Sequence, residues 1–354
     1  MEQMTSLQRA MAAIQGGVPD RVPVDLHNFM VTARASGHPF PEFFQNGRWM
    51  AEAQIAAWER FGHDVLLLEN GTAALAEACG CRVEYLADSA PVVVAPALER
   101  LADVETLEMP DPHRAHPLPE LLEATRRTVE AIGDRVCVMG RADQGPFSLA
   151  SMLRGQAAFL MDLALGQEVD RIHALLDFCR QVVTRYALAQ ADQGAHCTSI
   201  GESLAGPDVV SPAMYAAYAL PYDRQMARDL RRARVPLAYH ICGDITPIAG
   251  RMLDVGAAVI EFDHKADPAT VKALARGRAC LLGPVEPAVM ARGTPQQVEE
   301  LCRQAIEVLA PGGGFILGPG CALPPDTPPE NIQAMVEAAK KYGAYEIPGQ
   351  DRRA

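Results

Sequence analysis

The amino-acid sequence predicts one (β/α)8 barrel, the TIM-barrel fold, on the basis of three observations. Eight short runs of apolar or β-branched residues occur along the 354-residue chain, and most are almost continuously apolar, as strands buried on both faces are. Longer stretches with helical periodicity separate these runs, and eight such repeats favour a parallel sheet closed into a barrel. An open, doubly wound sheet is the competing fold, but no glycine-rich dinucleotide fingerprint follows an early strand. We therefore expect residues 1–354 to form a single barrel domain.

The predicted elements follow one another regularly, with one exception. The expected strands cover residues 21–25, 64–69, 136–140, 196–201, 236–241, 257–262, 279–283 and 314–318. The clearest helical stretches cover residues 121–131, 167–193, 212–234, 270–276 and 294–310. Residues 80–95 instead alternate like a strand, turn at 87–89 and alternate again, which predicts a β-hairpin excursion after the second barrel strand. Residues 350–354 are expected to form a loose tail.

Charge and cysteine content limit the classes of function. Lys and Arg total 32 and Asp and Glu total 44, which gives a net charge of −12. We expect no nucleic acid partner, because so acidic a surface repels phosphate. No apolar run reaches the roughly 20 residues that span a bilayer, and the acidic Glu2 stands where a signal peptide is basic. The nine cysteines follow no disulfide framework, so we expect a cytoplasmic protein without membrane contact.

Polar residues gather where the predicted strands end. Barrel enzymes place their chemistry at the carboxyl ends of the strands, so a candidate active site is expected at this rim. The residues in question are Glu69, Asn70, Arg141, Asp143, Gln144, Glu202, His240, Cys242, Asp263, His264, Glu286 and Cys321.

The most specific pattern at this rim is His240 and Cys242 together with Cys321. Residues two apart in an extended segment point to the same side, so His240 and Cys242 can both face the barrel mouth. Two thiolates and one imidazole suit zinc, and three protein ligands leave a fourth position open, as in catalytic rather than structural sites. The alternative is that these are unrelated buried residues, since free cysteine is among the most buried residue types.

Three carboxylates near the pattern are further candidates. Glu202 ends the fourth predicted strand and has two interpretations: an exchangeable fourth zinc ligand, or a strand-end carboxylate that positions a loop. Asp263 is a rim carboxylate, and with Glu202 it is our candidate for a catalytic role. Asp244 has two interpretations: it contacts His240 and orients its ring without binding the metal itself, or it helps to start the helix that follows.

Several segments resemble a known family. These are DRVPV at 20–24, GPFSLAS at 145–151, SPAMYAAYALPY at 211–222, HICGDITPI at 240–248, GPVEP at 283–287 and GGFILGPGCALPPDTPPENI at 313–332. In this order they resemble the methylcobamide:coenzyme M and chloromethane-type methyltransferases of the uroporphyrinogen decarboxylase superfamily, which has a (β/α)8 barrel. The resemblance covers nearly the whole chain.

The resemblance implies a corrinoid-dependent methyltransferase. In that branch the residues matching His240, Cys242 and Cys321 bind Zn²⁺, and the metal activates a thiol that accepts a methyl group from a methylated corrinoid. Because the sequence has no Asp-x-His-x-x-Gly corrinoid-binding motif, the methylcobamide is expected free or on a separate corrinoid protein. The thiol or other small methyl donor, and the direction of transfer, stay open, and a homodimer is compatible with the sequence.

Two other functions compete with this one. Uroporphyrinogen decarboxylation is the eponymous activity of the superfamily; it uses no metal and depends on an arginine-bearing N-terminal motif. The matching stretch here, RVPVDLHNFM, contains Arg21 as its one arginine. A non-catalytic, zinc-binding barrel is the second alternative, and it would need a firm fourth ligand such as Glu202.

Overall fold

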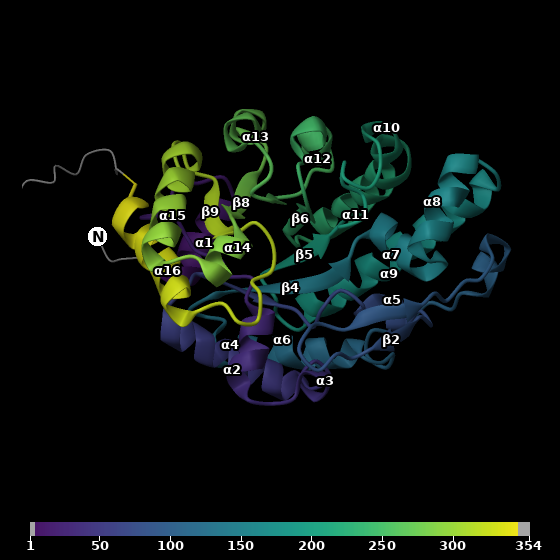
Figure 1. The fold of residues 1–354 in the computed structure, drawn as a ribbon, viewed down its shortest axis with the longest axis horizontal. Coiled ribbons are helices and arrows are strands. Elements are labelled where there is room, and N and C mark those ends of the chain that lie inside the picture. Colours follow the sequence, from purple (N-terminus) through teal and green to yellow (C-terminus); the bar gives the residue numbers. More distant parts are fainter. Residues whose placement is uncertain (1–3, 346–354) are drawn as a thin grey trace, which may run out of the picture.

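The structure, a computed structural model, describes residues 4–345, and its centre is a parallel sheet of seven strands (Figure 1). Neighbouring strands pair in sequence order, and almost every strand residue is buried. This confirms the predicted α/β fold with a parallel sheet. The strands are β1 (Val65–Leu68), β4 (Cys137–Gln144), β5 (Cys197–Gly201), β6 (Leu237–Ile241), β7 (Val259–Phe262), β8 (Cys280–Val285) and β9 (Phe315–Pro319).

A short segment at residues 23–25 joins the two edges of this sheet. Val24 forms a parallel bridge with Leu317 of β9, and Asp25 forms one with Val65 of β1. Backbone hydrogen bonds of 2.9 Å, donated by Asp25 N to Leu317 O and by Val65 N to Val24 O, hold the segment in place. The strand predicted at residues 21–25 is thus present as isolated bridges, because Pro23 has no N–H group to donate to a ladder.

Helices cover the outside of the sheet (Figure 1). All five predicted helical stretches are helical, but the one at 212–234 is divided by a π-helical turn at Tyr215–Ala219, just before Pro221, whose missing N–H interrupts the regular ladder. The helices are α1 (Ser6–Ile14), α2 (Phe29–Ser36), α3 (Phe40–Phe43), α4 (Gly47–Phe61), α5 (Ala74–Ala78), α6 (Leu118–Ile132), α7 (Pro146–Arg154), α8 (Gln156–Leu165), α9 (Val169–Asp192), α10 (Pro212–Met214), α11 (Leu220–Arg232), α12 (Ala249–Leu253), α13 (Pro268–Ala275), α14 (Pro287–Arg292), α15 (Pro295–Leu309) and α16 (Pro329–Tyr342).

The predicted hairpin excursion is confirmed. Strands β2 (Arg82–Glu84) and β3 (Val92–Ala95), which lie between β1 and β4 in the sequence, pair antiparallel in a separate two-stranded sheet. The predicted tail at 350–354 and residue Glu2 lie outside the described residues. Among the residues that are described, no helix is both long enough and apolar enough to cross a membrane.

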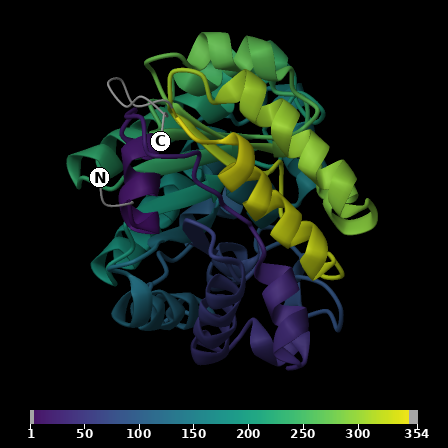
Figure 2. The same ribbon diagram turned by 90° about the vertical axis from the view of Figure 1, so that its left-hand side faces the viewer.

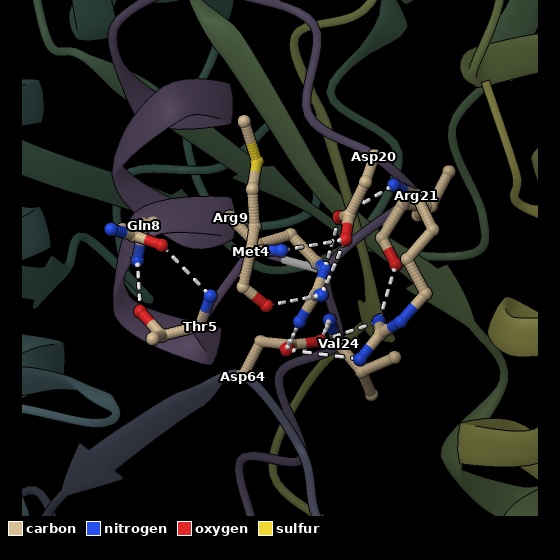
Figure 3. A network of polar contacts seen from close by, with 9 residues as sticks. Met4, Thr5, Gln8, Arg9, Asp20, Arg21, Val24 and Asp64 are labelled. Atoms are coloured by element: carbon tan, nitrogen blue, oxygen red, sulfur yellow. Dashed lines mark hydrogen bonds and ion pairs between the residues drawn. The ribbon is translucent and has the colours of Figure 1, made fainter. Parts of the chain in front are cut away.

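The N-terminal helix α1 covers the end of the barrel where the strands begin (Figure 2). Its residue Arg9 forms ion pairs with Asp20 at 2.6 Å and with Asp64 at 2.7 Å, and Arg21 reaches Asp64 at 2.7 Å (Figure 3). Asp64 also accepts a 2.9 Å hydrogen bond from the backbone N–H of Val24. This buried network therefore fixes α1 and the bridging segment to the start of β1, at the end of the barrel opposite the strand termini that form the mouth.

Candidate metal centre

Strand β6 brings His240 and Cys242 to the mouth of the barrel. His240 lies in the buried part of the strand, paired in register with Gly201 of β5 and Glu261 of β7. Cys242 follows directly after the strand, and the chain then turns at Gly243, whose φ of 83° favours glycine. It is this positive φ that makes the turn depend on glycine, since the atoms nearest to an added β-carbon belong to the movable carboxylate of the exposed Asp208.

The third residue of the pattern arrives from the loop after β9. Gly320 lets that loop approach closely, because a β-carbon there would lie 2.7 Å from the backbone nitrogen of His264. The ligand atoms of His240, Cys242 and Cys321 all lie within 4.8 Å of one another, and His240 Nε2 is 3.1 Å from Cys242 Sγ. Cys321, which is 81 positions after His240 and 79 after Cys242 in the sequence, therefore joins them in one compact group.

The two thiols of this group differ in their protonation. Hydrogen bonding with Cys321 lowers the pKa of Cys242, and the same contact raises the pKa of Cys321 to about 12. The hydroxyl of Ser203 and the charge of Arg141 lower the pKa of Cys242 further. Cys242 is thus the more easily ionised thiol of the two, and a metal ion bound by the pair would displace the thiol protons.

Sequence reasoning named Glu69 and Arg141 among the strand-end residues but missed His27 and Glu261, which join them in a buried layer of charged residues behind the group. Glu261 Oε1 lies 3.6 Å from His240 Nδ1 and 3.2 Å from His27 Nδ1, and His27 Nε2 lies 2.7 Å from Glu69 Oε2. Arg141 approaches Glu69 at 3.7 Å and donates to the Ser199 hydroxyl at 2.7 Å. With His27 protonated, the layer places two cations beside two anions that offset one another.

The electrostatics of this layer favour its ionised form. Burial alone would raise the pKa of Glu261, but the positive charges of His240 and His27 lower it to about 2. Burial likewise opposes a charge on His27, yet Glu69 and Glu261 raise its pKa well above the usual range. For Glu261 the sequence signal was a carboxylate inside the otherwise apolar run of β7, since charged residues are rarely buried unless they are paired.

Glu202 lies beside the group but faces another way. Its carboxylate accepts hydrogen bonds from the backbone N–H groups of Phe147 and Ser148, both at 2.8 Å, and from the Ser148 hydroxyl at 2.7 Å. These are the free donors of the first turn of α7, which attract a carboxylate. Among residues 4–345, the compact group contains His240, Cys242 and Cys321 without Glu202, and its contacts match the loop-positioning interpretation.

The other candidate carboxylates have positioning contacts. Asp263 accepts a 2.9 Å hydrogen bond from the backbone N–H of Gly243 and contacts the His264 ring at 2.5 Å. It therefore fixes the turn that carries Cys242. Asp244 accepts a hydrogen bond from the backbone N–H of Thr246 at 2.9 Å, which agrees with the second of its two interpretations, that it helps to start the next helical turn.

A family model for uroporphyrinogen decarboxylase (URO-D) matches residues 5–342 of the chain. The chain belongs to the uroporphyrinogen decarboxylase family. Within this family it is similar to methylcobamide:CoM methyltransferase MtbA of Methanosarcina acetivorans, with 30% identity over 352 residues that cover 97% of this chain and 99% of the relative. It is also similar to methylcobamide:CoM methyltransferase MtaA of Methanosarcina barkeri, with 28% identity over 350 residues, 97% of this chain and 100% of the relative.

A solved structure supports the same branch of the family. A methyltransferase from Methanosarcina mazei matches with a TM-score of 0.88 and 27% identity, covering 96% of this chain and 99% of that one. The resemblance inferred from the sequence segments and the barrel fold are thereby confirmed. Membership of the uroporphyrinogen decarboxylase family does not by itself distinguish decarboxylation from methyl transfer. The residues of the site must distinguish the two activities.

Proposed function

We propose that this protein is a zinc-dependent methyltransferase that moves a methyl group between a corrinoid and a small thiol. The observation that carries the proposal is the convergence of one imidazole and two thiols, His240, Cys242 and Cys321, within 4.8 Å at the barrel mouth. The named activity of the similar methyltransferases, transfer between a methylcobamide and coenzyme M, supports it.

The donor set fits a zinc ion chemically. Sulfur and imidazole nitrogen are the ligands that zinc prefers, and two thiolates balance the charge of a divalent cation. His240 Nδ1 is next to Glu261, which leaves Nε2 directed at the thiols, as in the carboxylate–histidine pairs that orient metal-binding histidines. With three protein donors, one tetrahedral position is left for a substrate.

A zinc ion held by these residues would stabilise the thiolate form of an acceptor thiol. In the proposed reaction the carbon–cobalt bond of the methylcobamide breaks and its electron pair stays on cobalt. A new carbon–sulfur bond forms, and the thiol proton leaves to solvent. The protein contributes position: Asp263 fixes the turn that carries Cys242, and the balanced layer of His27, Glu69, Arg141 and Glu261 keeps the surroundings of His240 fixed.

The corrinoid is proposed to arrive as a co-substrate, on a separate protein or free, because the sequence has no Asp-x-His-x-x-Gly motif. We assign Glu202 to the support of α7 rather than to the metal, on the basis of its three hydrogen bonds there. Uroporphyrinogen decarboxylation is disfavoured, because Arg21 is bound to Asp64 at the opposite end of the barrel from His240.

Proton release on thiol binding tests the proposal. Zinc-loaded protein in weakly buffered solution near pH 7 is mixed with coenzyme M and then with a panel of other small thiols. A true acceptor should release close to one proton per site, since coordination converts thiol to thiolate. The Cys242→Ala variant and a matching alcohol are the controls. Proton release that is equal for the alcohol, or unchanged in the variant, would contradict thiol activation at this site.

A further inference from the structure

His27 contacts both carboxylates of the buried layer behind the candidate metal centre. It lies two residues after the bridging segment, and its side chain is only 3% exposed. Each of its two ring nitrogens faces a different buried carboxylate: Nε2 lies 2.7 Å from Glu69 and Nδ1 lies 3.2 Å from Glu261. One histidine thus links the end of β1 to the middle of β7.

Both contacts require a hydrogen on the ring nitrogen. Ionised carboxylates only accept hydrogen bonds, so a neutral imidazole would turn one lone pair toward a carboxylate oxygen. The geometry therefore favours the doubly protonated ring, which donates to both partners. Together with Arg141 this places two positive charges beside the two carboxylates, Glu69 and Glu261.

The backbone at His27 supports a constrained role. Its φ is 42°, in a region that residues with a β-carbon seldom adopt. Its carbonyl oxygen accepts a 3.0 Å hydrogen bond from the backbone N–H of Leu323, in the loop that also carries Cys321. Unfavourable backbone angles persist where the surroundings hold them, and they concentrate at functional sites.

The contact with Glu261 matters because of what lies on its other side. Glu261 Oε1 lies within hydrogen-bond distance of His27 Nδ1, at 3.2 Å, and 3.6 Å from His240 Nδ1, an ion-pair distance at which no hydrogen bond forms. A carboxylate that is free to turn would leave the His240 ring without a fixed partner. If His27 holds the Glu261 carboxylate in place, its negative charge stays beside Nδ1 of His240, and Nε2 stays directed at Cys242.

We propose that His27 is a positioning residue of the metal centre, which acts by holding Glu261 against His240. The inference rests on the proposed function, because it assigns a purpose to His27 only if His240 binds a metal. It predicts that the bond from Nδ1 to Glu261 matters for the metal site and that the bond from Nε2 to Glu69 matters less.

Two substitutions separate these bonds. The amide nitrogen of asparagine is two bonds from Cβ, like Nδ1, whereas that of glutamine is three bonds away, like Nε2. His27→Asn therefore keeps a donor for Glu261, and His27→Gln keeps one for Glu69. Both remove the positive charge, so the charge is matched between them. His63, a buried histidine whose ring nitrogens have no hydrogen-bond partner within the described chain, provides the control pair His63→Asn and His63→Gln.

The readouts are zinc affinity, measured by competition with a chromophoric chelator, and the visible spectrum of the cobalt(II)-substituted protein. We expect His27→Gln to weaken zinc binding about 10- to 100-fold and to alter the cobalt spectrum, as loss of a residue that orients a ligand does. His27→Asn should stay within about threefold of the wild type on this scale. The His63 variants should leave both readouts unchanged.

A double-mutant cycle with Glu261→Gln guards against a general loss of folding. If His27 acts through Glu261, His27→Gln should add little to the loss of zinc affinity already caused by Glu261→Gln. Additive losses, equal effects of the Asn and Gln variants, or wild-type zinc affinity in both would overturn the role of His27 alone. Failure of the wild-type protein to bind zinc would overturn the proposed function, and the role of His27 with it.

Discussion

Glu202 Oε2 lies 2.7 Å from the hydroxyl oxygen of Ser148 and 2.8 Å from the backbone nitrogen of the same residue. These two bonds, with a third from the N–H of Phe147, attach β5 to the first turn of α7. Glu202→Gln replaces one acceptor oxygen by a donor that faces other donors, so we expect a loss of about 1–3 kcal/mol in the free energy of unfolding. Zinc content should not change. Loss of zinc with unchanged stability would restore Glu202 to the ligand set.

The proposed metal ligands are tested by removing each thiol. Cys242→Ala and Cys321→Ala should each weaken zinc binding strongly, because either change leaves an incomplete tetrahedral set. Cys302→Ala is the matched control, since Cys302 is a buried cysteine in α15. Zinc is measured by elemental analysis after dialysis against a chelator, with about one ion per chain expected in the wild type. Full occupancy in a variant lacking both thiols would rule out this site.

The site was predictable from the sequence to the extent that backbone periodicity determines it. The alternation of an extended chain places His240 and Cys242 on one side, and the strand-end rule brings Cys321 to the same rim. Glu202 was open to two interpretations, because its choice of partner depends on where α7 begins, and that depends on tertiary packing. Glu261 and His27 were missed because single charged residues in apolar runs acquire meaning only through partners distant in sequence.

The fold, too, was predictable where local sequence patterns determine it and not where other features of the chain intervene. Continuous apolar runs identified the seven strands of the sheet, and alternation with a turn identified the hairpin. The segment at 21–25 was expected to be a regular strand, but Pro23 leaves it with isolated bridges to β1 and β9. A π-helical turn before Pro221 divides a stretch that periodicity alone treats as one helix.

The ion-pair network at the base of the barrel should affect stability without affecting the metal. Asp64→Asn would leave Arg9 and Arg21 without their shared buried carboxylate, and we expect a loss of about 3–5 kcal/mol in the free energy of unfolding. Asp134→Asn is the control, since Asp134 pairs with Arg135 at 3.7 Å on an exposed surface, where such pairs contribute about 0–1 kcal/mol. Urea unfolding provides the measurement. A comparable loss in both variants would contradict the importance of the buried network.

Asp143 should make stability depend on pH. Burial raises its pKa to about 7, so the folded protein keeps this proton at pH values where the unfolded chain has lost it. Stability from this group therefore falls as the pH rises from about 4 to about 7. Asp143→Asn retains an acceptor for the Leu75 N–H and should gain roughly 2–4 kcal/mol relative to the wild type between pH 4 and pH 8. A difference in unfolding free energy that does not change with pH would refute this.

Zinc-dependent methyl transfer is tested most directly by the demethylation of methylcobalamin, measured by its visible absorbance, with zinc-loaded protein and a thiol that releases a proton on binding. We predict demethylation, with one methylated thiol formed per cobalamin demethylated, only when zinc, thiol and protein are all present, and its loss in Cys242→Ala but not in Cys302→Ala. Metal-free protein that works equally well, or a Cys242→Ala variant as active as the wild type, would contradict a zinc-activated thiol. If neither methylcobalamin nor a panel of methylated corrinoid proteins is demethylated, and reduced cobalamin is not methylated from any of a broad set of donors, the assignment as a methyltransferase is wrong.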